Sequence, residues 1–256
     1  MKKMLPLLLM FIALISCDRS KPDYKSELQG KWICNEINYL ITPTNEFFVM
    51  DFFPNNNLFL AQEYDLTEGA KWLETNSFTY SIDEETININ GTNALGEDMD
   101  LSMKIKRVGS NHLDYQEVRT VVNGMDISEG RIFSLYKKED VSAENFLGSW
   151  EIMQILKTDS LIPSKHKIDF KADGSFDLYN YEDAGWVKNE YMSNHYYVHG
   201  DILILNKEYI ENTPPHYEHR SFTISNISGE NITLDNFERK AGSSDLQGFR
   251  HKLIRN

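Results

Sequence analysis

The sequence has only two cysteines, at positions 17 and 34, and no apolar run as long as a transmembrane helix. The first shortage excludes a disulfide-rich scaffold, and the second excludes a membrane-spanning helix. Basic residues are outnumbered, with 26 Lys and Arg against 39 Asp and Glu, which gives a net charge of −13. Because so acidic a chain repels phosphate backbones, we expect no nucleic-acid partner.

The sequence also lacks the usual motifs of catalysis and of nucleotide or metal binding. It contains no G-x-G-x-x-G run, no P-loop and no G-x-S-x-G elbow. On a strand, His195 and His199 would lie about 13 Å apart, too far to share a metal ion. His216 and His219 have no further histidine or cysteine near them. We therefore expect no enzyme activity, no metal and no cofactor.

Strand-forming and turn-forming residues dominate the chain. It has 13 Tyr and 14 Phe, and no long window places apolar residues at helical spacing. Turn signals such as Asp173-Gly174 separate short apolar runs, and at that site a tight hairpin explains the residues better than a calcium loop. Sixteen strands are expected, near 31–40, 48–53, 57–64, 76–82, 86–90, 100–108, 112–121, 130–137, 149–157, 166–171, 175–181, 192–199, 202–206, 219–227, 231–238 and 247–255.

An internal repeat organises these strands. The run Leu28-x-Gly30-x-Trp32 returns 118 residues later as Phe146-x-Gly148-x-Trp150, and Asp51-Phe52 returns as Asp169-Phe170. Repeats of this kind mark duplicated structural units. Eight sequential antiparallel strands tend to close into a barrel, because closure removes exposed sheet edges. The sequence thus predicts two small up-and-down antiparallel β-barrels in tandem, at residues 28–138 and 145–256.

One strand is expected to be covered on both of its faces. Residues 202–205 read Ile-Leu-Ile-Leu, with no polar residue at either alternating position. Such a strand has no face suited to water.

The N-terminus has the features of an export signal. Lys2 and Lys3 precede an apolar stretch from residue 5 to residue 15, too short to span a ~30 Å hydrocarbon core. The run Leu-Ile-Ser-Cys that ends at Cys17 resembles the bacterial lipobox. That resemblance implies a signal peptide at 1–16, lipid attachment at Cys17 and a tether at 17–27. The alternative is an ordinary secretory signal with an unrelated cysteine.

The two L-x-G-x-W runs, together with the hairpin at 168–174, resemble the domains of bacterial lipocalin-like lipoproteins. The resemblance covers nearly all of residues 26–256 and implies that Gly30, Trp32, Gly148 and Trp150 close one end of each barrel. It also implies that an Arg near the last strand stacks on each Trp. Arg131 and Arg250 are the arginines that we expect in these two positions.

Aromatic residues with polar tips are the best candidates for ligand contact. Trp186, Tyr191 and Tyr196 fall between two strands of the second half, and Trp72 has a similar place in the first. Such side chains suit a barrel mouth, although alternating core aromatics would explain them equally. Cys34 lies two residues after Trp32 and is expected to be a buried, unreactive thiol.

These features favour a lipid-anchored protein of the cell envelope, at the outer membrane, with a non-catalytic binding role. The ligand would be a small apolar or amphipathic molecule held in one barrel, more readily the second. The alternative is an interaction module with filled barrels, which docks to another envelope protein or to a glycan. Inward residues such as Leu101, Met103 and Phe222 are large, which favours filled barrels. An enzyme would need a cleft with converging titratable groups.

Overall fold

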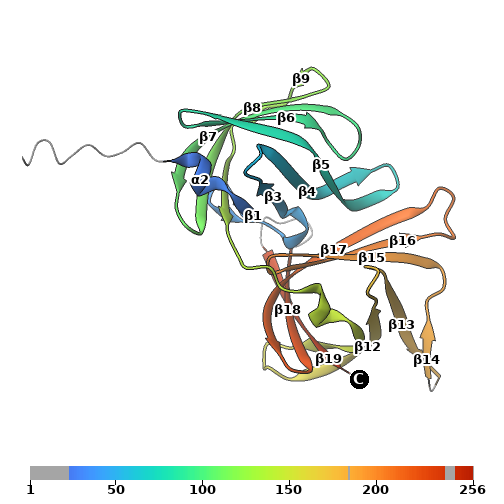
Figure 1. Cartoon of the computed structure of the whole chain (residues 1–256). Helices are drawn as coiled ribbons and strands as arrows, with labels where there is room; N and C mark the ends of the chain where they lie inside the picture. Colours follow the sequence, from blue (N-terminus) through green and yellow to red (C-terminus); the bar gives the residue numbers. More distant parts are fainter. Residues whose placement is uncertain (1–22, 184, 240–245, 256) are drawn as a thin grey trace, which may run out of the picture.

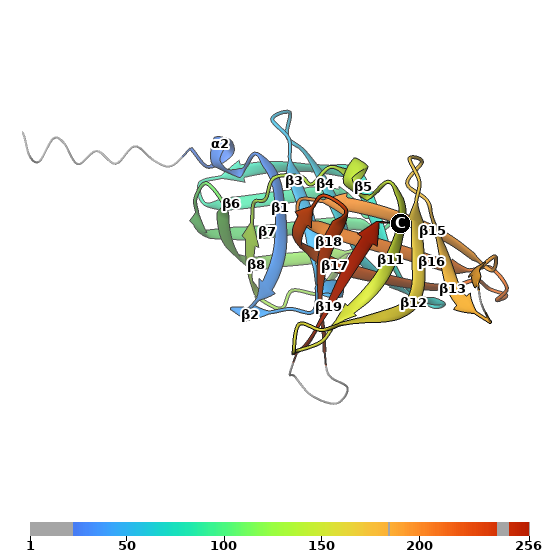
Figure 2. The same cartoon turned by 90° about the horizontal axis from the view of Figure 1, so that it is seen from below.

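The computed structural model describes residues 23–183, 185–239 and 246–255. About two thirds of them lie in strands, which pair antiparallel almost throughout, so the predicted all-β barrel class is confirmed. The strands form two lobes joined by one extended segment (Figure 1). In the view from below the first lobe, in blue and green, lies to the left of the second, in yellow to red (Figure 2). Within the described residues, no helix is long and apolar enough to cross a bilayer.

The first lobe, here called the first barrel, is a closed ring of eight strands. Strand β1 pairs with β3 on one side and with β10 on the other, which closes the ring. The eight strands are β1 (Gly30–Ile37), β3 (Phe48–Phe52), β4 (Asn57–Leu66), β5 (Gly69–Asp83), β6 (Thr86–Thr92), β7 (Asp98–Val108), β8 (His112–Val122) and β10 (Ile132–Tyr136). Four short elements decorate the ring: α2 (Tyr24–Leu28), β2 (Leu40–Ile41), η1 (Thr44–Glu46) and β9 (Met125–Asp126).

The second lobe, the second barrel, repeats this order after the short helix η2 (Ala143–Phe146). Strand β11 pairs with β12 and with the last strand, β19. Its strands are β11 (Gly148–Ile155), β12 (Leu161–Phe170), β13 (Phe176–Glu182), β14 (Gly185–Lys188), β15 (Met192–His199), β16 (Ile202–Tyr209), β17 (His216–Ser228), β18 (Asn231–Arg239) and β19 (Leu246–Arg255). Between β13 and β15 the described strand pairing is reduced to one β-bridge, Ser175–His195, because β14 folds back on β13. The Asn194 side chain adds a hydrogen bond to the Phe176 carbonyl.

The two predicted Gly-x-Trp sites have the same geometry in both barrels. Gly30 and Gly148 adopt φ of +102° and +103°, a region that disfavours side chains. The indole of Trp32 is fully buried and donates to the Leu28 carbonyl at 2.7 Å, and that of Trp150 donates to the Phe146 carbonyl at 2.5 Å. Each Trp therefore fills the barrel end where its chain segment enters.

The cations that stack on these tryptophans are not the predicted arginines. Lys137 Nζ lies 4.4 Å from the centre of the Trp32 ring, and Arg255 lies 4.2 Å from that of Trp150. The expectation for Arg131 and Arg250 was therefore wrong. Arg131 ion-pairs with Glu117 and Glu129, and Arg250 donates to Asp235 at 2.8 Å on the outer face.

Lys137 and Arg255 are themselves separated by the repeat length of 118 residues. Lys137 Nζ donates to the carbonyls of Glu27 and Gln29, and Arg255 donates to the carbonyls of Asn145 and Leu147, at the equivalent positions. Each cation thus combines a cation–π contact with hydrogen bonds to the entering chain. The sequence analysis missed this pair because it looked for arginine in both copies, and the first copy has a lysine at this position.

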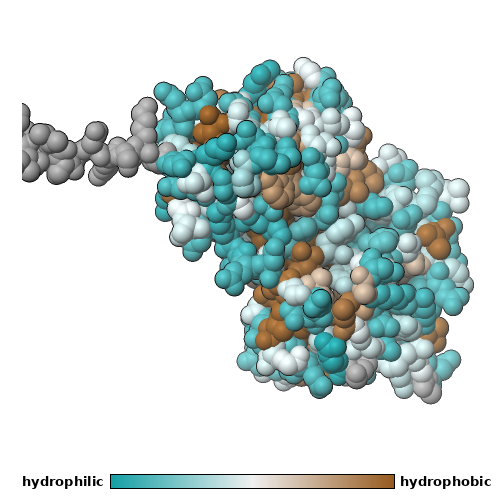
Figure 3. All heavy atoms as spheres, viewed as in Figure 1, coloured by the Kyte–Doolittle hydropathy of each residue, from teal (hydrophilic) through white to brown (hydrophobic). Residues whose placement is uncertain are grey.

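Strand β16 contributes to two cores at once, as its sequence predicted. Leu203 and Leu205 face the interior of the second barrel, whereas Ile202 and Ile204 face the outer wall of the first. All four are buried. The first-barrel side of this contact consists of Ile33, Phe47, Val49, Ala61 and Trp72. On the face drawn in Figure 3, several hydrophobic residues lie where the two lobes meet.

Polar contacts fix the position of the two barrels relative to each other. The Asn206 side chain accepts from the Trp72 backbone N–H at 3.0 Å and donates to the Trp72 carbonyl at 2.8 Å. His199 pairs with Glu74 at 2.7 Å. Gly69 lies so close to Tyr217 that an added Cβ would meet its carbonyl oxygen at 2.1 Å. The barrels therefore form one packed body.

Candidate functional site

The second barrel contains a cavity of about 240 Å³. It lies next to the end of the barrel that Trp150 fills, here called the packed end. Its wall is built from inward-facing residues of seven strands, and most of that wall is apolar. The lining side chains at the packed end and along the wall are Ile152, Ile168, Phe170, Phe176, Leu178, Leu203, Leu205, Phe222, Leu234 and Leu253. Successive inward residues are about 6.7 Å apart on a strand, so this wall is two or three side chains deep.

Toward the open end, four of these strands change from apolar to basic at the next inward position. On β16 the inward residues run Leu203, Leu205, Lys207, and on β17 Arg220 follows Phe222. On β19 His251 follows Leu253, and on β12 His166 follows Ile168. We call these four side chains, Lys207, Arg220, His251 and His166, the basic cluster.

The positive charges of the basic cluster are only partly neutralised. Lys207 is 16% exposed, and Glu218 Oε2 lies 3.9 Å from its Nζ. Arg220 is exposed, and among the described residues its guanidinium makes no hydrogen bond or ion pair. Burial lowers the pKa of Lys207, and the charge of Arg220 lowers it further, against the opposite effect of Glu218.

His251 is half-buried in the wall of the cavity. Its ring packs edge-on against Phe222, with 5.9 Å between ring centres, and its Nδ1 is buried with no hydrogen-bond partner among the described residues. Burial lowers the pKa of His251, as does Arg220, while Glu238 and Asp235 oppose the shift. A buried ring nitrogen without a partner is costly unless another polar group reaches it.

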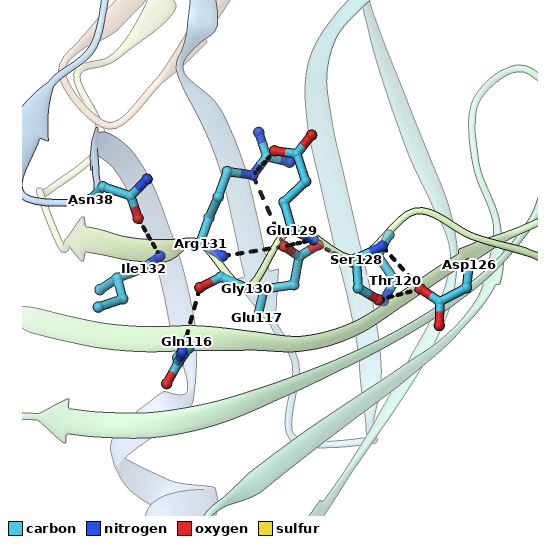
Figure 4. Close-up of polar contacts among 10 residues, drawn as sticks. All are labelled: Asn38, Gln116, Glu117, Thr120, Asp126, Ser128, Glu129, Gly130, Arg131 and Ile132. Carbon is cyan, nitrogen blue, oxygen red and sulfur yellow. Dashed lines mark hydrogen bonds and ion pairs between the residues drawn. The ribbon is translucent and has the colours of Figure 1, made fainter.

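The first barrel also has a hollow at its open end, of about 390 Å³, but its charged residues are paired. Glu117 is nearly fully buried and accepts from the Thr120 hydroxyl and from the backbone N–H groups of Glu129 and Arg131 (Figure 4). Burial alone would raise the pKa of Glu117, yet these hydrogen bonds lower it. Glu117 therefore ties the segment before β10 to β8, which is a structural role.

None of the four residues expected to contact a ligand lines the cavity of the second barrel. Trp72 is fully buried between the barrels, and Tyr196 is buried at the packed end, where its hydroxyl donates to the Lys171 carbonyl at 3.0 Å. Trp186 packs edge-on against Tyr181, with 5.3 Å between ring centres, and Tyr191 is exposed.

The basic cluster escaped the sequence analysis because its members are far apart in the chain and belong to no motif. A signal was nevertheless present. Comparing the inward positions of the two halves shows basic residues in the second where the first has apolar ones.

The cysteines and the other histidines named in the sequence analysis lie outside the cavity of the second barrel or outside the described residues. Cys17 lies outside the described residues, so its lipidation stays a prediction. Cys34 is buried, and burial raises the pKa of its thiol far above the ordinary value. His199 and His219 face Glu74 and Glu63 across the contact between the barrels. Within the described parts of the chain, His, Cys, Asp and Glu form no group of three or more that would hold a metal ion.

Comparison with known proteins leaves the family open. No protein-family model matches the chain, and neither does any curated protein. One solved structure, a double mutant of the vaccine antigen transferrin binding protein B from Haemophilus parasuis Hp5, aligns at 8% identity with a TM-score of 0.22. The alignment covers 80% of this chain and 52% of that one, so this chain spans about half of its length. A score this low supports no inference, and the fold rests on the strand pairing.

Proposed function

We propose that this chain is a lipid-anchored protein of the cell envelope, of the lipocalin-like kind, that binds a small apolar or amphipathic molecule in the second barrel. The observation that carries the proposal is the cavity of about 240 Å³ with an apolar wall and a polar opening. Enclosed apolar walls with a few polar groups are typical of small-molecule sites. The anchor would be Cys17, at the end of the lipobox-like run.

The size of the cavity limits the ligand. A cavity of about 150 Å³ holds benzene, which has six heavy atoms, so 240 Å³ would hold a molecule of roughly ten heavy atoms. The bound molecule would therefore be a short acyl chain or a substituted ring.

A binding role, without catalysis, fits the chemistry of the cavity wall. The one hydroxyl in the described lining belongs to Ser164, and it donates to the Ile152 carbonyl at 2.6 Å. The hydroxyl accepts from the backbone N–H of His166, while the His166 ring is hydrogen-bonded to the Asn180 side chain. In the described lining, no histidine ring therefore bonds to this hydroxyl as the base that would activate it as a nucleophile.

The first test is organic extraction and mass spectrometry of residues 18–256, purified without detergent from the native compartment. One dominant small molecule near one per chain, lost on unfolding, would support the proposal. The variant Leu178→Trp should block the cavity and abolish capture. Leu60→Trp is the matched control, because Leu60 lines the first hollow at the position equivalent to Leu178. A clean extract, with no thermal stabilisation by a panel of lipids and sugars, would contradict the proposal.

The anchor is tested separately. Cells fed a labelled fatty acid should label the native chain and not the variant Cys17→Ser, which should fractionate away from membranes. Equal membrane association of both proteins would contradict lipidation at Cys17.

One observation favours docking to another envelope protein as a second function. The first barrel exposes apolar side chains in two turns, Tyr39, Leu40 and Ile41 in one and Met125 and Ile127 in the other, of which Leu40 is 71% and Met125 66% exposed. Exposed apolar groups of this kind often mark interaction sites. A photo-crosslinker at position 125 should capture a specific envelope protein, whereas one at exposed Val187 of the second barrel should not.

A further inference from the structure

The two barrels are built alike but differ in what their open ends present. Their strand registers define the equivalence: Phe48 opposite Cys34 corresponds to His166 opposite Ile152. Leu101 opposite Ile89 likewise corresponds to Arg220 opposite Leu205. The remaining two equivalences are Phe133 with His251 and Gly91 with Lys207. Four positions that are uncharged in the first barrel are thus basic in the second.

We propose that the second barrel selects an anionic amphiphile, whose apolar tail fills the cavity and whose carboxylate, or a similar single anionic group, binds the basic cluster. This inference rests on the proposed function and adds the chemical class of the ligand.

The geometry supplies both halves of such a ligand site. The apolar wall ends one inward residue before Arg220, Lys207 and His251, so a tail in the cavity places its head among them. Arg220 offers a planar fork of donors that fits a carboxylate, and Lys207 offers a flexible point charge. His251 Nδ1 lies buried on the same wall without a partner.

The charge balance favours an anion in this place. Arg220 disfavours the charged forms of both Lys207 and His251, and Glu218 at 3.9 Å from Lys207 offsets this only in part. An anionic head would relieve that repulsion. Such a positive site is also distinctive in a chain with a net charge of −13.

The test compares ligands with the same tail and different heads. Octanoate, octanol and octyltrimethylammonium would be titrated calorimetrically into residues 18–256, which include every strand of the structure. Octanoate has ten heavy atoms and fits the size limit set by the cavity. We expect octanoate to bind at least tenfold more tightly than octanol, and the cationic amphiphile to bind least. Acetate at the same concentration should not compete, because it lacks the tail.

Variants assign the preference to the basic cluster. Arg220→Leu installs the residue of the first barrel, and we expect the ratio of octanoate affinity to octanol affinity to fall about tenfold. Arg220→Lys should retain part of the preference. Arg250→Ala is the matched control, because Arg250 lies next to His251 on β19 but pairs with Asp235 on the outer face. Circular dichroism would verify the folding of each variant.

The outcomes separate this inference from the proposed function. Equal binding of octanoate and octanol would overturn the anionic preference and leave the apolar site standing. Equal loss for both ligands in Arg220→Leu would also overturn it, because the arginine would then act through the shape of the site. If none of the three amphiphiles bound, this inference would be overturned, and the proposed function would fail with it only if the native extract were also clean.

Discussion

The contact between the barrels makes a quantitative prediction at Ile204. This side chain has no exposed surface and packs on the outer wall of the first barrel. The substitution Ile204→Ala removes about three carbon groups, each contributing about 0.8 kcal/mol of burial, or about 2.4 kcal/mol together. The space left between two sheets adds a cavity cost, and such truncations reduce stability by about 2–5 kcal/mol. We expect the free energy of unfolding to fall by about 3 kcal/mol.

The neighbouring residue provides the matched control. Leu203 is equally buried but faces the interior of the second barrel. In urea unfolding followed by circular dichroism and tryptophan fluorescence, Leu203→Ala should lose a similar amount and also enlarge the ligand cavity. Ile204→Ala should leave octanoate binding unchanged. If Ile204→Ala cost less than about 1 kcal/mol while Leu203→Ala lost its full amount, the barrels would not pack against each other as described.

Three further predictions concern the cations that stack on Trp32 and Trp150 and the buried titratable groups Glu117 and His251. Lys137→Ala and Arg255→Ala should each lower the free energy of unfolding by about 1–2 kcal/mol, because each removes a cation–π contact and hydrogen bonds to the entering chain. Arg250→Ala breaks an exposed ion pair and should change the free energy of unfolding by less than about 0.5 kcal/mol. The lowered pKa of Glu117 means that its stabilisation is present above the ordinary value of 4.5 and is lost as the pH falls through the folded pKa, so Glu117→Gln should flatten the acid limb of the stability curve. Burial lowers the pKa of His251, so below the ordinary value of 6.5 the unfolded chain binds a proton that the folded chain does not. The free energy of unfolding should therefore decrease as the pH is lowered through this range. His251→Phe should reduce this pH dependence, measured by urea titrations at pH 5 and pH 7.5. An unchanged slope would contradict the assigned environment of the residue.

The sequence predicted the strands well because alternation and turn residues are local signals. All sixteen expected strands overlap observed ones, and the strand at 202–205 is buried on both faces as its apolar run indicated. The short strands β2, β9 and β14 were missed, since two to four residues carry no readable period. The four ligand candidates were chosen for aromatic character, which cannot distinguish a barrel mouth from a core.

The basic cluster and the contact between the barrels depend on long-range register. Lys207 and Arg220 become neighbours because β16 and β17 pair with Leu205 opposite Arg220. No local sequence pattern indicates that Lys207 and Arg220 both point into the barrel near its open end. Likewise, Trp72 meets Asn206 only because the outer walls of two barrels meet. The sequence could show that Ile202 and Ile204 need cover, but not what provides it.

Strand β16 has a consequence for how the chain can be divided. The repeat suggests a cut in the linker near residue 140, and each product would contain a full set of barrel strands. A fragment that ended there would nevertheless leave Val49, Ala61 and Trp72 in water, and its partner would expose Ile202 and Ile204. The unit that was duplicated is therefore smaller than the unit that is stable in solution, and fragments designed from the repeat alone would be prone to aggregate.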